Sequence, residues 1–227
     1  MTDPQHRLER ALDALDAAFA PPADRPFPLD GCEHCYSGAD LALLRGPVSR
    51  VPDRLVSSVA HKTPDHWDDF PALYRRFAPR TVRLLVAGRL DSALVASRLL
   101  ATGWRDWPEP EPGVLGEVWG AWWGSVLHRY PGAVHVVDVL EVVSVSTGVL
   151  APWLDLWART RTAAADLHLR DALGRWLPEG GIDGLRFGFY GEVHAAPELV
   201  PWLLSLDEGR VSAFQRELLN EAWRGGR

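Results

Sequence analysis

Apolar residues recur at intervals of three and four along most of the chain, and proline or glycine interrupts this pattern every few turns. Such spacing places side chains on one face of an α-helix. The 18 prolines and 20 glycines among 227 residues keep the individual helices short. The pattern therefore predicts an all-α protein of about ten short helices, stacked as antiparallel pairs that resemble an irregular α-solenoid.

Three segments test this interpretation. The segment 132–147 is rich in valine, which favours strands, but its polar residues recur every third position, so we predict a largely buried helix. The segment 185–193 contains three glycines and is ambiguous. Pro71 and Pro79 predict that 65–86 forms two or three short helices in series.

Glycine recurs at every fourth position within the helix predicted over 114–129, at Gly116, Gly120 and Gly124. On a helix these residues share one face and permit another backbone to approach closely. Close core packing is the main interpretation, and a ligand cleft or a dimer seam is the alternative.

The stretch 107–112 alternates proline with glutamate and is typical of a linker. It predicts an N-terminal helical lobe over 1–106 that contains both cysteines, a linker over 107–112, and a C-terminal helical lobe over 113–227. One continuous domain is the alternative, because a chain of this length suits one large domain or two small ones.

The net charge of −6 argues against nucleic acid as a partner. No run of about 18 uncharged apolar residues predicts a membrane span, and no apolar signal region is visible near residue 1. With only two cysteines, the chain is predicted to be cytoplasmic. Lysine, isoleucine and asparagine each occur once, which indicates a GC-rich, bacterial source.

Cys32 and Cys35 are the only cysteines, and their spacing lets both thiolates bind one metal ion. A structural zinc site needs four ligands, and no second Cys-x-x-Cys motif supplies the other two. His34 lies between the cysteines, while His61 and His66 flank a predicted bend. Two cysteines and two of these three histidines would complete the shell, so we predict one zinc ion here.

Two other interpretations of the cysteines stay open. They could be inert thiols packed beneath a loop, or a redox pair. A thioredoxin-like pair expects a strand before the motif, and 26–31 is a poor strand, so redox chemistry ranks last.

His135, Asp138 and Glu141 recur every third residue, so neighbouring members can meet on one helix. They are a second candidate for a metal or catalytic site. The structural interpretation is that each pairs with an arginine from another helix, since all but one of the 24 basic residues are arginine.

Two groups are candidates for binding a partner. Trp104 and Trp107 flank the predicted linker, where an exposed indole is a credible contact. Arg76, Arg80 and Arg83 form a basic stripe if one helix continues through 76–83, and the stripe could dock an acidic partner. A solvated face with acidic neighbours is the ordinary interpretation of such a stripe.

The runs Gly31-Cys32-Glu33-His34-Cys35-Tyr36-Ser37-Gly38-Ala39-Asp40-Leu41 and Thr63-Pro64-Asp65-His66-Trp67-Asp68-Asp69-Phe70 resemble a family of uncharacterised bacterial proteins. Those proteins share a cysteine-containing turn, a Trp-Asp-Asp-Phe-like segment and a helical remainder. The segments 152–157 and 167–169 are also similar. The resemblance implies an all-α fold and brings no activity and no site residue with it.

The chain has no phosphate-binding glycine loop, nucleophile elbow or His-Glu-x-x-His motif. We therefore predict no catalytic residues and a non-enzymatic helical scaffold that binds a protein or peptide, with a structural zinc site. The alternative is a metal-dependent enzyme or metal-handling protein that uses Cys32 and Cys35 with a histidine, or the second candidate site.

Overall fold

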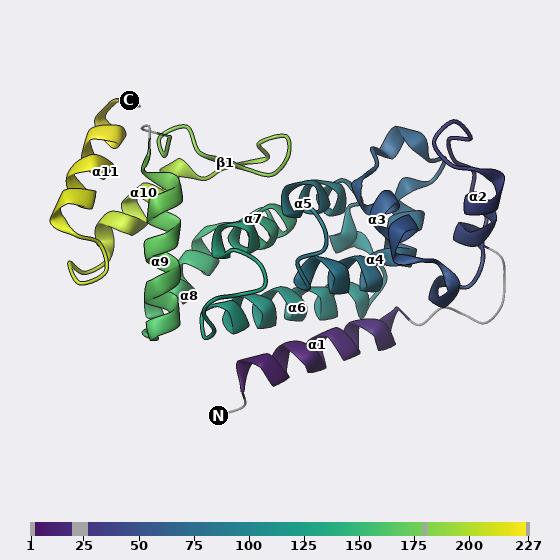
Figure 1. The fold of residues 1–227 in the computed structure, drawn as a ribbon, viewed down its shortest axis with the longest axis horizontal. Coiled ribbons are helices and arrows are strands. Elements are labelled where there is room, and N and C mark those ends of the chain that lie inside the picture. Colours follow the sequence, from purple (N-terminus) through teal and green to yellow (C-terminus); the bar gives the residue numbers. More distant parts are fainter. Residues whose placement is uncertain (1–2, 20–26, 179–180, 226–227) are drawn as a thin grey trace.

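The all-α class is confirmed by the structure, a computed structural model that describes residues 3–19, 27–178 and 181–225 (Figure 1). Within these ranges it contains eleven α-helices. The first five are α1 (Pro4–Ala18), α2 (Gly38–Arg45), α3 (Asp53–His61), α4 (Phe70–Val86) and α5 (Ser92–Ala101). The others are α6 (Glu111–Val126), α7 (Val136–Thr147), α8 (Ala151–Arg159), α9 (Ala163–Trp176), α10 (Ala196–Ser205) and α11 (Ala213–Gly225).

Short elements connect these helices. Three are 3₁₀ helices, namely η1 (Val48–Arg50), η2 (Pro64–His66) and η3 (Trp104–Asp106). The ambiguous segment 185–193 contributes to a small antiparallel hairpin of β1 (Arg186–Phe187) and β2 (Val193–His194). Gly188 and Gly191 in its loop have positive φ angles of 91° and 70°, a conformation that glycine adopts without strain.

Most helices begin where a polar side chain satisfies a backbone donor of the first turn. Asp3 caps α1, Ser37 caps α2 and Asp91 caps α5, each by accepting a hydrogen bond from a backbone N–H two or three residues later. The valine-rich segment 132–147 contains α7, so the prediction of a buried helix there is confirmed.

The prediction that proline divides 65–86 into several short helices is wrong from residue 70 onward. Pro71 lies in the first turn of α4, where its missing N–H has no partner to lose. Pro79 lies inside the helix and is buried between Ala78 and Val82. Apolar burial on both sides of Pro79 offsets the lost hydrogen bond, so the helix continues through 17 residues.

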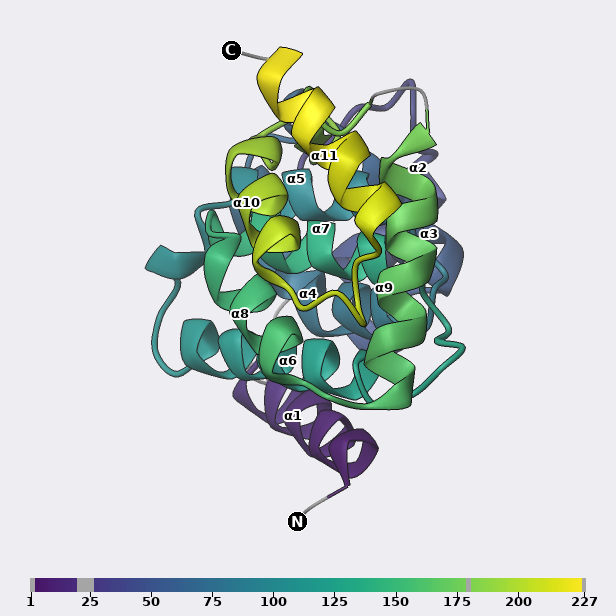
Figure 2. The ribbon, with the colours of Figure 1, turned by 90° about the vertical axis from the view of Figure 1, so that its left-hand side faces the viewer.

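The most extensive interfaces between helices join helices that are distant in the sequence. α1 lies along α6, and α5 lies along α7 (Figures 1 and 2). The first pair is antiparallel, because Ser125 Oγ donates to Gln5 Oε1 while Phe19 packs against Trp107 at the opposite end. The all-α class is thus confirmed, whereas a solenoid of consecutive helix pairs is not.

The same two pairs cross the predicted boundary at 107–112, since each joins a helix before it to a helix after it. Part of the predicted linker is helical, because α6 begins at Glu111. The division into two lobes stays a prediction. The glycine series on α6 does not serve close packing, because a Cβ at Gly116, Gly120 or Gly124 would meet nothing within 4 Å.

Tryptophan fills much of the core. Trp119, Trp123 and Trp157 are fully buried, and the Trp157 ring packs edge-on against Trp123 with centroids 5.3 Å apart. α8 to α11 gather at the end of the molecule that faces the viewer in Figure 2. In the described part of the chain, no helix has the length and apolar character needed to cross a membrane.

Candidate metal centre

Backbone pairing joins the cysteine loop to the connection between α3 and α4. Gly31 forms an isolated antiparallel bridge with Trp67, and the Cys32 N–H donates to the His66 carbonyl at 2.9 Å. A Cβ at Gly31 would lie 2.6 Å from the Trp67 ring, so only glycine permits this approach. The pairing brings His66 beside Cys32.

A tight turn gathers the two thiols. The N–H groups of Cys35 and Tyr36 both donate to the Cys32 carbonyl at 3.0 Å, which closes the chain on itself. The Tyr36 ring then packs on Trp67 with centroids 4.7 Å apart, and its hydroxyl hydrogen-bonds Ser58 Oγ at 2.9 Å. Tyr36 is buried and anchors the turn to α3.

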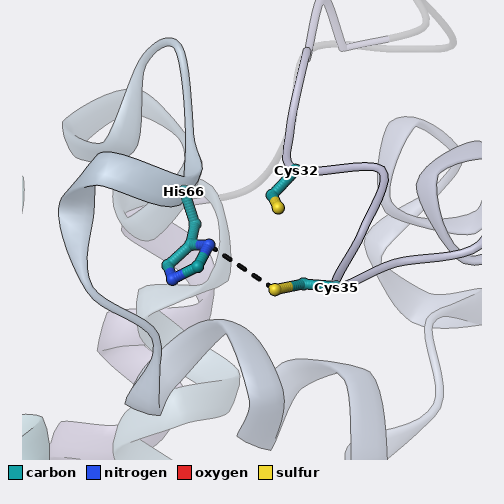
Figure 3. A group of neighbouring side chains, drawn as sticks. All are labelled: Cys32, Cys35 and His66. Atoms are coloured by element: carbon teal, nitrogen blue, oxygen red, sulfur yellow. Dashed lines mark hydrogen bonds between the residues drawn. The ribbon is translucent and has the colours of Figure 1, made fainter.

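Cys32, Cys35 and His66 form a cluster whose ligand atoms all lie within 4.8 Å of one another (Figure 3). Cys35 Sγ lies 3.6 Å from His66 Nδ1. All three residues are half-buried, and both cysteines are free thiols. Among the residues that the structure describes, this is the one group of three or more potential metal ligands.

The surroundings of the cluster favour thiolate. The His66 ring, followed by the backbone N–H of Cys35, lowers the pKa of Cys32 to about 7. Lys62 Nζ donates to Cys35 Sγ at 3.5 Å, and its positive charge favours a thiolate there. Thiolate is the form that binds metal and that reacts as a nucleophile, so this site could do either.

Of the three candidate histidines, the structure brings only His66 to the thiols. His34 is exposed within the turn and is not part of the cluster. His61 ends α3, and its Nε2 accepts a hydrogen bond from the Asp91 N–H at 3.2 Å. Burial lowers the pKa of His61, consistent with a neutral ring that accepts this bond.

The second candidate site does not form a cluster, because each member has its own partner. His135 caps α7 by accepting from the Val137 N–H at 3.2 Å. Asp138 pairs with Arg175 at 2.6 Å, and Glu141 accepts from the Gly188 N–H at 2.6 Å. One arginine, one backbone donor and one cap thus replace the three arginines that the structural interpretation expected.

The two candidate tryptophans are covered by the protein itself. Trp104 is buried and donates its Nε1–H to the Ser146 carbonyl at 3.0 Å. Trp107 is also buried and packs edge-on against Phe19. A partner would have to displace core contacts to reach either indole, so the linker does not expose them as expected.

The three candidate arginines lie on α4 and contact other parts of the chain. Arg76 donates to the Gly46 carbonyl at the end of α2. Arg80 donates to two carbonyls beside η1, and Arg83 pairs with acidic residues of α1. The stripe therefore holds four helical elements together, and its role in binding a partner stays a prediction.

Sequence reasoning missed Lys62 as a neighbour of the cysteines. Its signal was that it is the only lysine in the chain and lies between two candidate ligands in the sequence. The backbone bridge at Gly31 left no such signal, because bridges between distant segments follow no local pattern.

Comparison with known proteins gives no relative. No family model, curated protein or solved structure matches this chain. The resemblance of 31–41 and 63–70 to a bacterial family therefore stays a prediction. What the residues themselves define is an all-α protein with a Cys₂His cluster between two loops.

Proposed function

We propose that this protein is a zinc-binding helical protein in which Cys32, Cys35 and His66 hold one zinc ion. The observation that carries the proposal is the convergence of three ligand atoms within 4.8 Å from two segments separated by more than 30 residues. The ion joins the cysteine loop to the connection between α3 and α4, and acts as a structural clip.

The donor set selects the metal. Two thiolates and one imidazole are soft and intermediate ligands, which suit zinc and disfavour magnesium or calcium. The lowered pKa of Cys32 supports the proposal, because binding then displaces fewer protons at neutral pH. His34 lies outside the cluster in this structure, and we propose that its exposed side chain turns toward the ion to supply the fourth ligand, because it lies in the turn between the two cysteines.

The test is elemental analysis of purified, chelator-washed protein with a parallel count of free thiols. We expect about one zinc per chain, and loss of zinc in Cys32→Ser and His66→Ala. The matched control is His61→Ala, which removes a nearby histidine outside the cluster and should retain zinc. Two titratable thiols and no metal in the wild-type protein would refute the proposal.

Zinc should also stabilise the fold. With free zinc at about 1,000 times its Kd, the free energy of unfolding rises by about 4 kcal/mol. Thermal unfolding with and without chelator measures this, and Cys35→Ser should abolish the difference. A wild-type melting temperature that is insensitive to chelator would argue against a clip.

A second candidate is a metal-dependent enzyme or metal-handling protein. The observation that favours it is that the cluster has three protein ligands, as in catalytic zinc sites that leave one position for water. His34→Ala separates the two functions. The experiment replaces zinc with cobalt and follows the cobalt absorption spectrum as azide is added. An equal spectral change in wild type and His34→Ala would indicate an open coordination position and a catalytic site.

A further inference from the structure

The loop of the β1–β2 hairpin is held firmly on α5 and α7. Glu141 accepts from the Gly188 N–H at 2.6 Å, and Ser97 Oγ accepts from the Phe189 N–H at 2.9 Å. Glu192 accepts from the Tyr190 N–H at 3.1 Å. The backbone of the loop is thus fixed by hydrogen bonds, while Tyr190 as a residue is 62% exposed.

Arg98 lies beneath this side chain and is only 3% exposed. Its Nη1 donates to the Tyr190 hydroxyl at 3.0 Å, and its guanidinium carbon lies 5.3 Å from the centre of the Tyr190 ring. Its Nε is buried, and no acceptor in the described part of the chain bonds to it. Among the described residues, Tyr190 is the one whose side chain hydrogen-bonds to this guanidinium.

A buried guanidinium normally has a carboxylate partner, because an unpaired buried charge is costly. Arg210, the other buried arginine of the described residues, follows this rule and pairs with Asp166 at 2.8 Å. Around Arg98, no described carboxylate oxygen lies within 4 Å. The charge of Arg98 is felt by its neighbours: it adds to the lowering of the His61 pKa by burial, which the Asp91 carboxylate opposes, and it contributes to the lowered pKa of Asp65.

We propose that Arg98 is the centre of an oxyanion-binding site, for a carboxylate or phosphate group, and that the Tyr190 side chain is its cover. The donors that bind the ligand are the two terminal nitrogens of Arg98, Nη1, which the Tyr190 hydroxyl occupies in this structure, and Nη2. A guanidinium presents them as a planar fork that matches two oxygens of a carboxylate or phosphate.

The cover can open without any change of fold. Exposed side chains change rotamer within nanoseconds, and the three backbone hydrogen bonds of the loop are independent of the Tyr190 ring. An incoming oxyanion replaces a neutral hydroxyl and a ring face with a full negative charge. The bond to the Tyr190 hydroxyl is charged on its donor side only. An oxyanion adds the opposite charge and a second acceptor oxygen, and such bidentate pairs are the stronger ones, so the exchange favours the ligand.

The test is an NMR titration of the Arg98 side-chain Nε–H signal, identified by its loss in Arg98→Gln. At constant ionic strength, sodium phosphate and sodium acetate are each added, with sodium chloride as the reference. We expect a saturable shift with phosphate, acetate or both, and the two arms show which oxyanion the site accepts. A shift no larger than that caused by chloride overturns the proposal.

Tyr190→Ala gives an independent arm that does not alter a buried residue. Removing the competing hydroxyl and ring should tighten binding of the preferred anion by about tenfold. The matched control is Tyr130→Ala, which removes another exposed tyrosine, one that packs on His168, and should leave affinity unchanged. Equal affinity in wild type and Tyr190→Ala would show that Tyr190 is no cover.

The site is independent of the proposed zinc ion. Phosphate can also bind zinc, so the titration is repeated on Cys32→Ser, where the response of Arg98 should persist. In Arg98→Gln, which has no Arg98 signal, anion binding is measured by the rise in melting temperature. An anion effect that is lost in Cys32→Ser but kept in Arg98→Gln would place the anion at the metal and overturn this proposal.

Discussion

At the scale of single residues, Cys32 shows how neighbours set reactivity. It is half-buried, and the His66 ring and then the Cys35 N–H lower its pKa to about 7. In metal-free protein, the rate of Cys32 alkylation by iodoacetamide should rise with pH around a midpoint near 7, because thiolate is the reactive form. Mass spectrometry measures the rate at each cysteine separately.

His66→Ala removes the largest cause of the lowered Cys32 pKa. The midpoint of Cys32 alkylation in this variant should therefore move toward the ordinary cysteine pKa of about 8.5. His61→Ala serves as the control and should leave the midpoint unchanged. A wild-type midpoint near the ordinary value would mean that His66 does not contact the thiol in solution.

At the scale of elements, the arginines of α4 differ in what they hold. Arg80 donates to the carbonyls of Val48 and Val51 and pairs with Asp53, so it joins η1 and α3 to α4. Arg80→Ala should lower the free energy of unfolding by about 2 kcal/mol, because it leaves several acceptors without their donor. Urea denaturation gives this value.

Arg83 is the matched control on the same face of α4, where its side chain is 39% exposed and pairs with two exposed aspartates of α1. Arg83→Ala should cost less than about 1 kcal/mol, because solvent screens exposed ion pairs. An equal loss of unfolding free energy in the two variants would contradict the conclusion that Arg80 joins η1 and α3 to α4.

The hairpin adds a pH dependence at the same scale. Burial raises the pKa of Glu141, although the Gly188 N–H opposes the shift. The folded protein therefore binds this proton more tightly than the unfolded chain does. The contribution of Glu141 to stability therefore falls as pH rises above the ordinary glutamate pKa of about 4.3, because the unfolded chain releases this proton first.

Glu141→Gln retains an acceptor for the Gly188 N–H and removes the titration. Relative to this variant, wild-type protein should lose stability as pH rises from about 4 toward 7. Urea unfolding of both proteins at each pH isolates the effect from other groups. If the unfolding free energy of the wild type relative to Glu141→Gln stays constant or increases with pH, the raised pKa of Glu141 is contradicted.

At the scale of the whole molecule, α1 packs on α6 and α5 packs on α7 across the predicted boundary at 107–112. We therefore expect one cooperative unfolding transition, with coincident curves from tryptophan fluorescence and far-ultraviolet circular dichroism. Because the fully buried Trp119, Trp123 and Trp157 all follow the boundary, their fluorescence reports the second half of the chain. Separate transitions would instead support two independent lobes.

The positions of most helices were predictable because their signals are local. The spacing of apolar and polar residues acts within about four residues, and it predicted the helices over 114–129 and 132–147 that the structure shows as α6 and α7. Pro79 misled for the same reason, since its cost is local whereas the burial that offsets it comes from other helices.

The sequence by itself determined the all-α class, the positions of most helices and the pair of thiols. Only the tertiary structure decided that His66 joins Cys32 and Cys35 and that Trp104 and Trp107 are core residues. It also decided that no described carboxylate lies within 4 Å of Arg98. These outcomes depend on contacts between segments distant in the chain, which bury surface no local pattern encodes. Periodicity shows which residues share a face, but not what that face meets.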